Sequence, residues 1–561
     1  MGQPPHRRAL AIALLLAMPV LFAGQNWGLP GRSADRYLFG DRTPWPGAKI
    51  LQLSGGWAPN SARGADVASD PLRGRDRVLT LNDTDTERAR ILLRYRLYSD
   101  QPDEMITFRA LAGMHPGHDS YGGMDPRLYQ YGGLWIYPVG ILLRLSPVTL
   151  RSDIAWYLDH PEAFGRFYVV ARCYSATWGL LGVAIVFLLV RRICGGWAFP
   201  LAGGLLFALL PVVVDQSHDA KPHLAGAVLI LCAALAGSIH VETARRSAAI
   251  GAGALCGAAM GMVLSAYPAF LILPMMALLR GQRPCKIAGP LAAALGVYLA
   301  TNPYIAINLI CNREVLRSNL GNSAAMYHAA ASGSALTNAT LLIANGAGVL
   351  TALAGAVGAV LLARRAVRMR ADTAPAELRR RATGLLLAAP AIWIALQFVV
   401  FASGKPGEYG RFALYPDIVL AIEAIAAIHT FAPSRAFQAV LVGLLLLSTG
   451  WLGMRYLAGF VRDCGANNSR LAAAQELADL NYQGRHVLRI ANEPAPYCLP
   501  PVDLFSWQLQ LIPRGQPLAP QNADEVAVQP SEDDSLSAAL ASPRMSWAAK
   551  QFDIRVVRRG K

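Results

Sequence analysis

The stretch that decides the fold is WGLLGVAIVFLLVRR, residues 178–192. It belongs to an apolar segment at about residues 167–190, which as a helix is long enough to cross the hydrocarbon core of a bilayer, about 30 Å thick. The two arginines at its end are typical of a cytoplasmic helix end. Because such segments recur along the chain, the sequence predicts a polytopic α-helical membrane protein.

Similar apolar segments bring the prediction to about eleven transmembrane helices. The first follows a basic cluster and lacks a convincing small-residue cleavage site, so we expect an uncleaved helix with its N-terminus in the cytoplasm. Besides the segment at 167–190, the predicted helices lie near residues 9–24 (the N-terminal one), 197–214, 224–240, 248–265, 267–280, 287–301, 336–363, 383–402, 412–430 and 436–456.

Composition supports this prediction. The chain has 561 residues, of which 54% are hydrophobic, and this is too apolar for a soluble multidomain enzyme. The net charge of +16 does not indicate nucleic-acid binding, because the basic residues form short clusters between apolar segments. Their excess in alternate loops places those loops inside. We therefore expect an integral protein of the bacterial inner membrane, in contact with membrane lipids.

The loops divide the chain into two predicted parts. Residues 1–456 form a transmembrane domain whose long first loop, residues 25–165, faces outward, and residues 457–561 form a small outer α/β domain. Within that tail we expect residues 516–537 to be mobile. The tail's predicted helix and strands are Arg470–Leu480, His486–Ile490 and Phe552–Val557.

The first loop contains an acidic pair in the stretch Ser99–Met105. Pro102 suits the first turn of a helix, so Asp103 and Glu104 stand where exposed N–H groups favour ionised carboxylates. Such a pair can serve as a general base, as a metal ligand, or as both. On spacing alone, ordinary acid enrichment in a first turn is the simpler explanation. The predicted position of the pair, in an outer loop of a membrane protein, favours a catalytic or metal-binding role.

A second polar group lies in the turn between two apolar helices, at Asp215–His223. Asp, Ser and Pro would serve any short turn, but His218, Lys221 and His223 together are more than a turn requires. Further polar stretches follow the same predicted face at Thr301–Tyr304 and Gly404–Arg411. Carboxylates, imidazoles, tyrosines and fixed positive charges on one face suit a substrate with an anionic leaving group at the lipid boundary.

These motifs resemble, in their order, the GT-C superfamily of integral-membrane glycosyltransferases. The pattern is closest to the branch with protein O-mannosyltransferases and lipid A aminoarabinose transferases, and the likeness covers about residues 9–456. The carrying features are Pro102-Asp103-Glu104, Tyr137-Pro138, Arg172 opening the second span, the turn Ala220-Lys221-Pro222-His223, Asn302-Pro303-Tyr304 and Gly410-Arg411-Phe412.

The resemblance implies transfer of a sugar from a polyprenyl-phosphate donor to a lipid, glycan or protein hydroxyl on the outer face. Asp103 matches the catalytic base, with Glu104 supporting it. Lys221, Lys405, Arg411 and Arg172 are candidates for the donor phosphate. A divalent metal ion at Asp103 and Asp219 is a further expectation. Candidate substrate-binding residues are Tyr129, Tyr131, Tyr137, His218, Asp219, His223 and Tyr304.

Two departures from the pattern are a long insertion before Pro102 and a histidine, His223, where relatives often have an acid. They leave acceptor identity and metal dependence open. Tyr129 and Tyr131 equally suit stacking on a substrate or an aromatic belt at the headgroups. Cys464 and Cys498 equally suit a disulfide or two thiols.

Two other function classes compete with this one. A transporter or flippase of a lipid-linked substrate would favour two similar halves with broken helices and polar residues at mid-membrane. The sequence shows no such repeat, and its charges gather at one face. A non-catalytic scaffold would leave Asp103 and Glu104 as a helix cap only.

Overall fold

The chain folds into two compact units, each made of separate parts of the sequence. Unit 1 comprises Met1–Ala23, Asp119–Pro138 and Cys173–Leu457, and unit 2 comprises Gly24–His118, Val139–Arg172 and Ala458–Lys561. The computed structural model describes residues 5–57, 78–116, 122–326, 335–367, 375–401, 410–465, 468–480, 486–491, 500–513, 516–520, 525–530 and 554–557.

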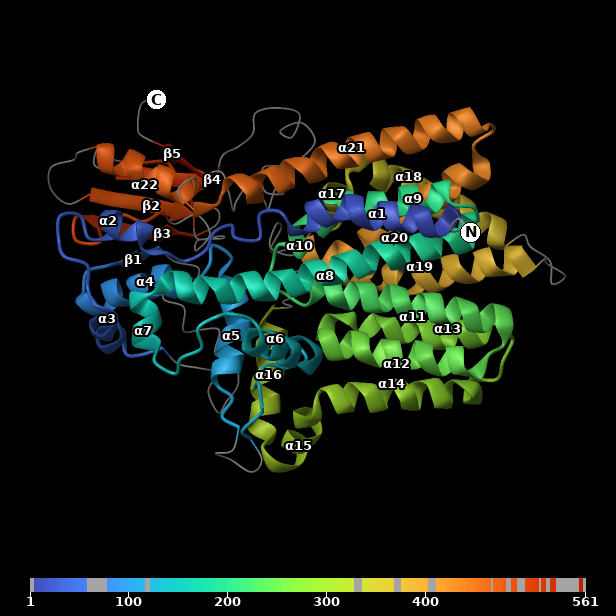
Figure 1. Ribbon diagram of the computed structural model, residues 1–561, viewed down its shortest axis with the longest axis horizontal. Coiled ribbons are helices and arrows are strands. Elements are labelled where there is room, and N and C mark those ends of the chain that lie inside the picture. The colour runs from blue at the N-terminus through green and yellow to red at the C-terminus, as the bar shows by residue number, and fades with distance from the viewer. Residues whose placement is uncertain are drawn as a thin grey trace. The chain divides into compact units, whose positions relative to one another are not determined.

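Unit 1 consists of apolar helices, as the sequence predicts (Figure 1). Three helices, α6, α8 and α21, contribute residues to both units. The helices are α1 (Pro5–Phe22), α6 (Gly133–Leu145), α8 (Pro161–Cys194), α9 (Ala198–Leu209), α10 (Pro211–Ser217), α11 (His223–Thr243), α12 (Arg246–Met262), η4 (Leu264–Leu271), α13 (Ile272–Leu279), η5 (Pro284–Ile287), α14 (Ala288–Thr301), α15 (Pro303–Cys311), α16 (Arg313–Met326), α17 (Ala335–Ala347), α18 (Val349–Val367), α19 (Pro375–Phe401), η7 (Gly410–Ala413), α20 (Leu414–Phe431) and α21 (Arg435–Arg462).

The polytopic helical fold class is confirmed. Within the described residues, six helices are long and apolar enough to cross a membrane, and three bent pairs bring the total to nine. The two remaining predicted segments coincide with α12 and with the shorter apolar stretch Leu264–Leu279. The predicted segments are therefore all helical, although not all of them are continuous.

Two predicted spans, 197–214 and 336–363, contain a break, and a third bend follows the predicted span 287–301 at Asn302. α9 and α10 meet at 61°, the α14 and α15 segments at 76°, and the α17 and α18 segments at 107°. Pro211 and Pro303 open the second helix of the first two pairs, where their missing N–H groups interrupt the helical hydrogen bonds. Gly348, with a φ of 81°, separates the last pair. The prediction of one continuous helix at residues 336–363 is wrong for this reason.

Helix packing in unit 1 relies on small residues. α12 packs between α11 and α14, and α18 packs against α20 (Figure 1). A Cβ atom at Gly253 or Gly257 would lie 2.0 Å from a backbone oxygen of α14. Small residues four positions apart thus let two helix backbones approach closely, which is how apolar helices gain contact in lipid.

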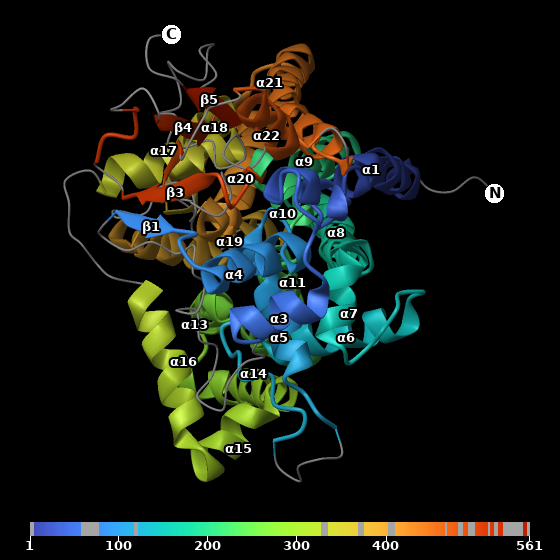
Figure 2. The same ribbon diagram turned by 90° about the vertical axis from the view of Figure 1, so that its left-hand side faces the viewer.

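Unit 2 is an α/β fold around a five-stranded sheet (Figure 2). The strand order is β1-β3-β2-β4-β5, with β2 parallel to β3 and β4 and with antiparallel edge strands. Its elements are η1 (Arg32–Ala34), α2 (Asp35–Leu38), α3 (Gly47–Ser54), β1 (Leu79–Leu81), α4 (Asp85–Leu97), η3 (Pro102–Glu104), α5 (Met105–Ala112), α7 (Ile154–Asp159), α22 (Ser469–Asp479), β2 (His486–Ala491), β3 (Trp507–Ile512), β4 (Glu525–Pro530) and β5 (Ile554–Val557).

The sheet joins the first loop to the C-terminal tail. β1 comes from the first loop and pairs with β3 of the tail, Thr80 opposite Gln510. The next residue, Asn82, donates from Nδ2 to the Leu504 carbonyl at 3.0 Å and accepts from the Leu509 amide at 2.9 Å. The predicted boundary at residue 457 thus marks one edge of a unit that also contains most of the first loop.

The predicted elements of the tail are present as α22, β2 and β5. The prediction of mobility at residues 516–537 is wrong for β4, which lies inside that range. Its polar flanks suggest disorder, but Val526, Ala527 and Val528 are buried and pair with β2 and β5. Long-range pairing orders a short apolar run that composition alone assigns to a loop.

Strand pairing between β1 and β3 also constrains topology, because two paired strands must lie on the same side of a membrane. We expect reporter fusions after Gly133 and after Asp479 to report the same, non-cytoplasmic side. Fusions would be scored with a reporter active only outside and one active only inside the cytoplasm. Opposite sides for the two positions would contradict the strand pairing.

Candidate active site

Glu104 forms a buried ion pair in unit 2. Both Glu104 and Arg172 are fully buried. Arg172 donates from Nε to Oε1 at 2.8 Å and from Nη2 to Oε2 at 2.7 Å. Its Nη1 donates to the carbonyls of Gln25 and Trp27 at 2.9 and 2.7 Å. This two-pronged geometry fixes both side chains, so Glu104 serves as an anchor.

Asp103 differs from its neighbour by being only half-buried. It lies in η3, the turn of 3-10 helix that leads into α5, as the sequence predicts. The apolar face of α5 is buried through Met105 and Phe108, and Phe108 packs edge-on against Tyr168 at 4.8 Å between ring centroids. The helix start is therefore rigid, and Asp103 is presented by a fixed backbone next to an anchored glutamate.

The ion pair predicts a stability effect. Replacing Glu104 by glutamine leaves the buried Arg172 charge without its counter-charge, and breaking such a pair typically costs about 3–5 kcal/mol. We expect Glu104→Gln to lower the unfolding temperature and membrane abundance of the protein, and to reduce activity per folded molecule less than loss of Asp103. Glu87→Gln, a change at a partly exposed position on α4, is the matched control in thermal unfolding. Equal unfolding temperatures for both variants would contradict the anchoring role.

Unit 1 places the turn between α10 and α11 in its interior. Asp215, His218, Asp219 and Lys221 are at most 1% exposed. Lys221 Nζ lies 3.6 Å from Asp219 Oδ2, and the Ser175 hydroxyl donates to the Asp219 carbonyl at 2.7 Å. Buried charges on a turn need partners, and Lys221 supplies one to Asp219, while the Gln216 amide donates to Asp215 at 2.7 Å. The turn is thus a charged cluster within the helical unit.

His218 links this cluster to the end of α1. Its Nδ1 lies 2.6 Å from the Val214 carbonyl oxygen and 3.1 Å from the Ser217 hydroxyl oxygen. Its Nε2 lies 2.6 Å from the Ala23 carbonyl oxygen. Because Ala23 follows the last residue of α1, this contact ties that helix end to the turn between α10 and α11.

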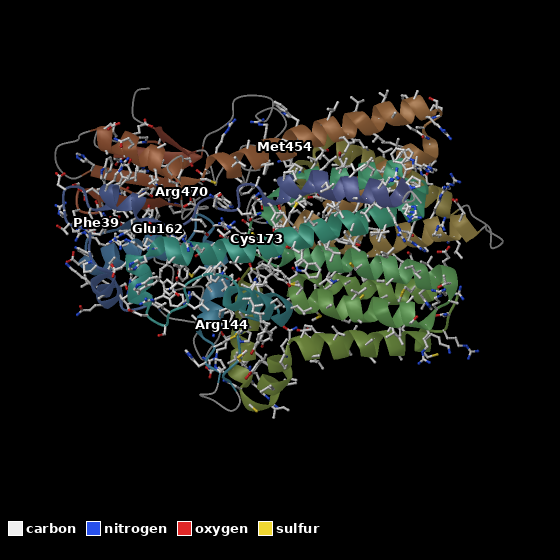
Figure 3. The ribbon with its side chains drawn as sticks, viewed as in Figure 1. Phe39, Arg144, Glu162, Cys173, Met454 and Arg470 are labelled. Carbon is white, nitrogen blue, oxygen red and sulfur yellow. The ribbon has the colours of Figure 1, made fainter. Side chains whose placement is uncertain are left out.

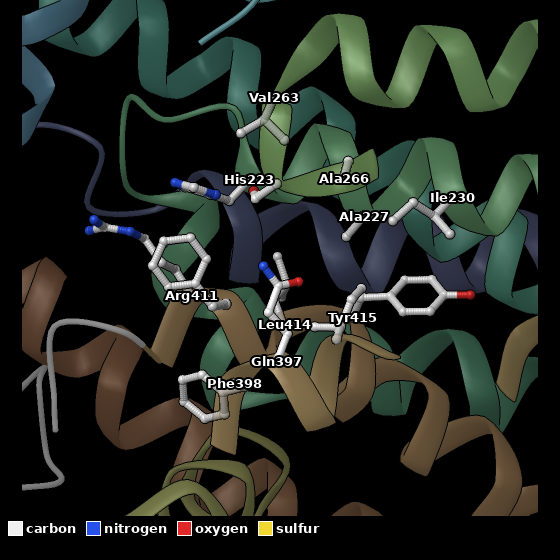
Figure 4. A pocket seen from close by; sticks show the side chains of 13 residues that line it. His223, Ala227, Ile230, Val263, Ala266, Gln397, Phe398, Arg411, Leu414 and Tyr415 are labelled. Carbon is white, nitrogen blue, oxygen red and sulfur yellow. The ribbon is translucent and has the colours of Figure 1, made fainter. Parts of the chain in front are cut away.

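A small pocket opens in unit 1 beside this turn (Figure 4). His223 and Arg411 lie at one side of it, and Ile230 and Tyr415 lie at the other (Figure 4). Most of the wall between them is apolar. The lining residues are His223, Ala227, Ile230, Val263, Ser265, Ala266, Ile394, Gln397, Phe398, Arg411, Phe412, Leu414 and Tyr415.

The polar side of the pocket is held by aromatic contacts. The His223 ring stands edge-on to Phe412 at 5.5 Å and to Tyr131 at 5.9 Å. The Arg411 guanidinium lies 5.3 Å from the Phe412 ring centroid. His223, which follows the charged turn, lines the pocket together with Arg411. The charged turn and the polar side of the pocket therefore adjoin within unit 1.

The predicted substrate-binding tyrosines, apart from Tyr131, hold a strap formed by residues 124–133. Tyr129 donates to Asp125 Oδ1 at 2.9 Å, and burial followed by the Asp125 carboxylate raises the pKa of its hydroxyl. Tyr137 donates to the Met124 carbonyl at 3.2 Å, and Tyr304 accepts from the Met124 amide at 3.2 Å. These contacts fix the strap, which carries Tyr131 to His223.

The strap is also bound through the Asn302 side chain. Asn302 Oδ1 accepts from the Gly133 amide at 2.9 Å, and the Gly132 amide donates to the Met262 carbonyl at 3.0 Å. The strap thus adds a short strand-like contact beside Val263, a residue of the pocket wall. The motif Asn302-Pro303-Tyr304 does not by itself indicate that Asn302 holds the strap.

A second buried charge cluster in unit 2 has no signal in the sequence. Asp100 Oδ2 accepts from Arg470 Nη1 at 2.8 Å and from Asn468 Nδ2 at 2.9 Å. Asp463 Oδ2 lies 3.8 Å from Arg470 Nη1, and Asp463 Oδ1 accepts from the Ser469 amide at 2.7 Å. The cluster brings two carboxylates to one arginine: Asp100, which follows Ser99 in the first loop, and Asp463 of the tail.

This cluster predicts a pH dependence of stability. Burial and the Asp100 carboxylate raise the pKa of Asp463 to about 7, while Arg470 opposes the shift. An unfolded aspartate titrates near 3.9, so the folded state binds more protons between about pH 4 and pH 7, and stability from this group is lost as pH rises through that window. We expect the unfolding temperature of the wild type to fall by several degrees relative to Asp463→Asn between pH 4 and pH 8. Parallel curves for the two proteins would contradict it.

The remaining predicted residues are distributed as follows. Asp103, Glu104 and Arg172 belong to unit 2, whereas Asp219, Lys221 and Arg411 belong to unit 1. Lys405 and Cys498 lie outside the described residues, and Cys464 Sγ lies 3.2 Å from Asn26 Oδ1. No group of three or more His, Cys, Asp or Glu side chains within the described residues is placed to hold a metal ion. The metal ion at Asp103 and Asp219 stays a prediction.

Comparison with known proteins gives a structural likeness only, since no family model and no curated protein match the sequence. The crystal structure of ArnT from Cupriavidus metallidurans in the apo state shares 16% identity over 71% of this chain and 80% of that chain, with a TM-score of 0.43. This chain is similar to ArnT. The crystal structure of ArnT from Cupriavidus metallidurans bound to undecaprenyl phosphate shares 17% identity over 73% of this chain and 83% of that chain, with a TM-score of 0.40. Similarity of this size assigns no role to any single residue.

Proposed function

We propose that this integral membrane protein is a glycosyltransferase. It moves a sugar from a polyprenyl-phosphate donor to a hydroxyl group of a lipid, glycan or protein on the outer face of the bacterial inner membrane. The observation that carries the proposal is the pocket of unit 1, which combines a cationic side with an apolar wall. The resemblance of the motifs to GT-C glycosyltransferases supports it.

The pocket suits a ligand that is anionic at one end and apolar along the rest. Arg411 can bind phosphate oxygens through two N–H groups at once, and His223 adds a second nitrogen donor beside it. The wall formed by Ala227, Ile230 and Phe398 is apolar and offers no partner to a charged group. Because this pocket lies among helices long enough to cross a membrane, a lipid phosphate can enter it without leaving the bilayer.

The reaction replaces one C–O bond by another. The acceptor oxygen bonds to the anomeric carbon of the sugar, and the bond between that carbon and the donor phosphate oxygen breaks. The electron pair leaves with the phosphate, and a general base takes the proton of the acceptor hydroxyl; the motif resemblance makes Asp103 the candidate for that base. Asp103 suits this step because it is half-buried on a rigid helix start, while its neighbour Glu104 is committed to Arg172.

Positive charge near the leaving phosphate lowers the barrier, because negative charge grows on the leaving oxygen. Arg411 is the candidate at the pocket, and Lys221 stands in the turn that precedes His223, another pocket residue. Lys221 Nζ lies 3.6 Å from Asp219 Oδ2, so a phosphate bound near Lys221 would compete with that carboxylate for the positive charge.

A donor screen tests the proposal. Membranes containing the protein would be incubated with polyprenyl-phosphate monosaccharides, hexoses and pentoses, each labelled in the sugar. We expect label to move from the donor into a lipid, glycan or protein fraction, with release of polyprenyl phosphate, only when the protein is present. Membranes from the same strain without the protein are the control.

A lipid-linked transporter is the second candidate, and one observation favours it. Three broken spans in unit 1 are a feature that transporters share. Transport would move labelled donor between the two leaflets of reconstituted vesicles without breaking its sugar–phosphate bond. Movement of intact donor, with no label in any acceptor fraction across the screen, would replace the transferase proposal by this one.

A further inference from the structure

The stretch Ser99–Glu104 is held at both ends by a buried arginine. At one end Arg172 forms a bidentate ion pair with Glu104. At the other end Arg470, which comes from α22 in the C-terminal tail, grips Asp100 and is 3% exposed. Arg470 is labelled in Figure 3. Asp103 lies between these two ion pairs, so its backbone position depends on both.

The segment of residues 25–28 contacts Arg172 directly and contacts the two aspartates beside Arg470. Arg172 donates to the carbonyls of Gln25 and Trp27. Gly28 then accepts from the Asp100 amide at 2.8 Å and donates to the Asp463 carbonyl at 3.2 Å. Gly28 has a φ of 54°, and a Cβ atom there would lie 2.6 Å from Asp100 Cβ. Glycine is therefore required where this segment passes Asp100.

On the tail side, the contact to Asp100 comes from the start of a well-anchored helix. Asn468 caps α22 by accepting from the Arg470 amide at 2.8 Å, and it also donates to Asp100. α22 buries Ala473, Ala474 and Leu477 and packs against β5 of the sheet. A helix fixed in this way can transmit its position to the residues that its first turn holds.

We propose that the C-terminal tail positions the acidic stretch of the first loop, and that Arg470 is the positioning residue, acting on Asp103 through Asp100. This inference rests on the proposed function, because it assigns the tail a part in presenting the base. The tail is then a component of the active site and not an independent binding domain. In this role Arg470 acts through Asp100 and not on the donor or acceptor.

Kinetics of Arg470 variants test the proposal. Displacing a base by about 1 Å can cost about 10²-fold in rate. We expect Arg470→Ala to lower kcat about 10-fold to 100-fold with donor KM changed less than about 2-fold, because the donor pocket belongs to unit 1. Arg470→Lys keeps a charge and one hydrogen bond to Asp100, so it should recover part of the loss. Arg489→Ala is the matched control, since Arg489 is a buried arginine of β2 whose partners are Glu525 and the Pro517 carbonyl.

A second measurement is independent of activity. An Asp103→Cys variant would be labelled with a maleimide, and the labelling rate at position 103 measured by mass spectrometry with and without Arg470→Ala. We expect release of the stretch to change that rate about 10-fold, and Arg489→Ala to leave it unchanged. A wild type that transfers no sugar would defeat the proposed function, while the labelling result would still test the positioning. An unchanged labelling rate, or an Arg470→Ala protein with the kcat of Arg489→Ala, would overturn the role of Arg470.

Discussion

We expect Asp103→Asn to transfer sugar about 10²–10⁴-fold more slowly than the wild type, while folding and inserting normally. Loss of a positioned general base costs about that much, because the acceptor hydroxyl must then lose its proton to water. The amide keeps the size of the carboxylate, and Asp103 is half-buried and outside the buried ion pair, so the change should not unfold unit 2. Initial rates at saturating donor, normalised to folded protein, are the measurement.

The matched control for this variant is Asp85→Asn. Asp85 also stands in the first turn of a helix of unit 2, and its side chain is 56% exposed beside Arg88. This control should keep the wild-type rate, since an exposed first-turn acid contributes only modestly to its helix. An Asp103→Asn protein that keeps most of its activity would end the assignment of Asp103 as the base and would leave the pair as a helix cap.

The acidic stretch shows how far the sequence reaches. Pro102 and the apolar spacing that begins at Met105 predict a helix start, and η3 and α5 are found there. These signals are local, because proline fixes its own backbone angle and helical spacing is read over a few residues. Arg172 is likewise conspicuous in sequence as an arginine at the start of a span. Its commitment to Glu104 is a contact across 68 positions, and no local pattern announces it.

Partners that are remote in the chain account for most of what the sequence does not predict. β1 lies more than four hundred positions from β3, and three residues of ordinary strand composition give no register for such a pair. Arg470 sits in a correctly predicted helix, yet its partner Asp100 belongs to the first loop. The pocket is likewise only partly predictable from the sequence. His223 and Arg411 belong to motifs that the sequence shows, whereas no local pattern marks Gln397 and Tyr415 as lining residues.

The second large effect is expected at Arg411. In the proposed reaction the polyprenyl phosphate is the leaving group. A fixed positive charge lowers the barrier, because its attraction to the leaving oxygen grows as the sugar–phosphate bond breaks. Arg411 is placed on η7 at the polar side of the pocket, beside His223. We expect Arg411→Ala to lower turnover about 10²-fold while lowering protein abundance far less. Arg411→Lys should recover only part of the rate, because an ammonium group cannot bind phosphate through two parallel hydrogen bonds.

The alternative for Arg411 is that it anchors a helix end at the lipid headgroups, and a matched arginine separates the two roles. Arg280 caps the end of α13 in the same unit and donates to the Val241 carbonyl at 3.1 Å, with no part in the pocket. Under limiting donor, Arg280→Ala should keep the wild-type rate per folded molecule, whereas Arg411→Ala should not. If Arg411→Ala and Lys405→Ala each transfer sugar at the wild-type rate, the phosphate is held elsewhere. Lys221 is then the next candidate, because Arg172 already spends its hydrogen bonds on Glu104 and two backbone carbonyls.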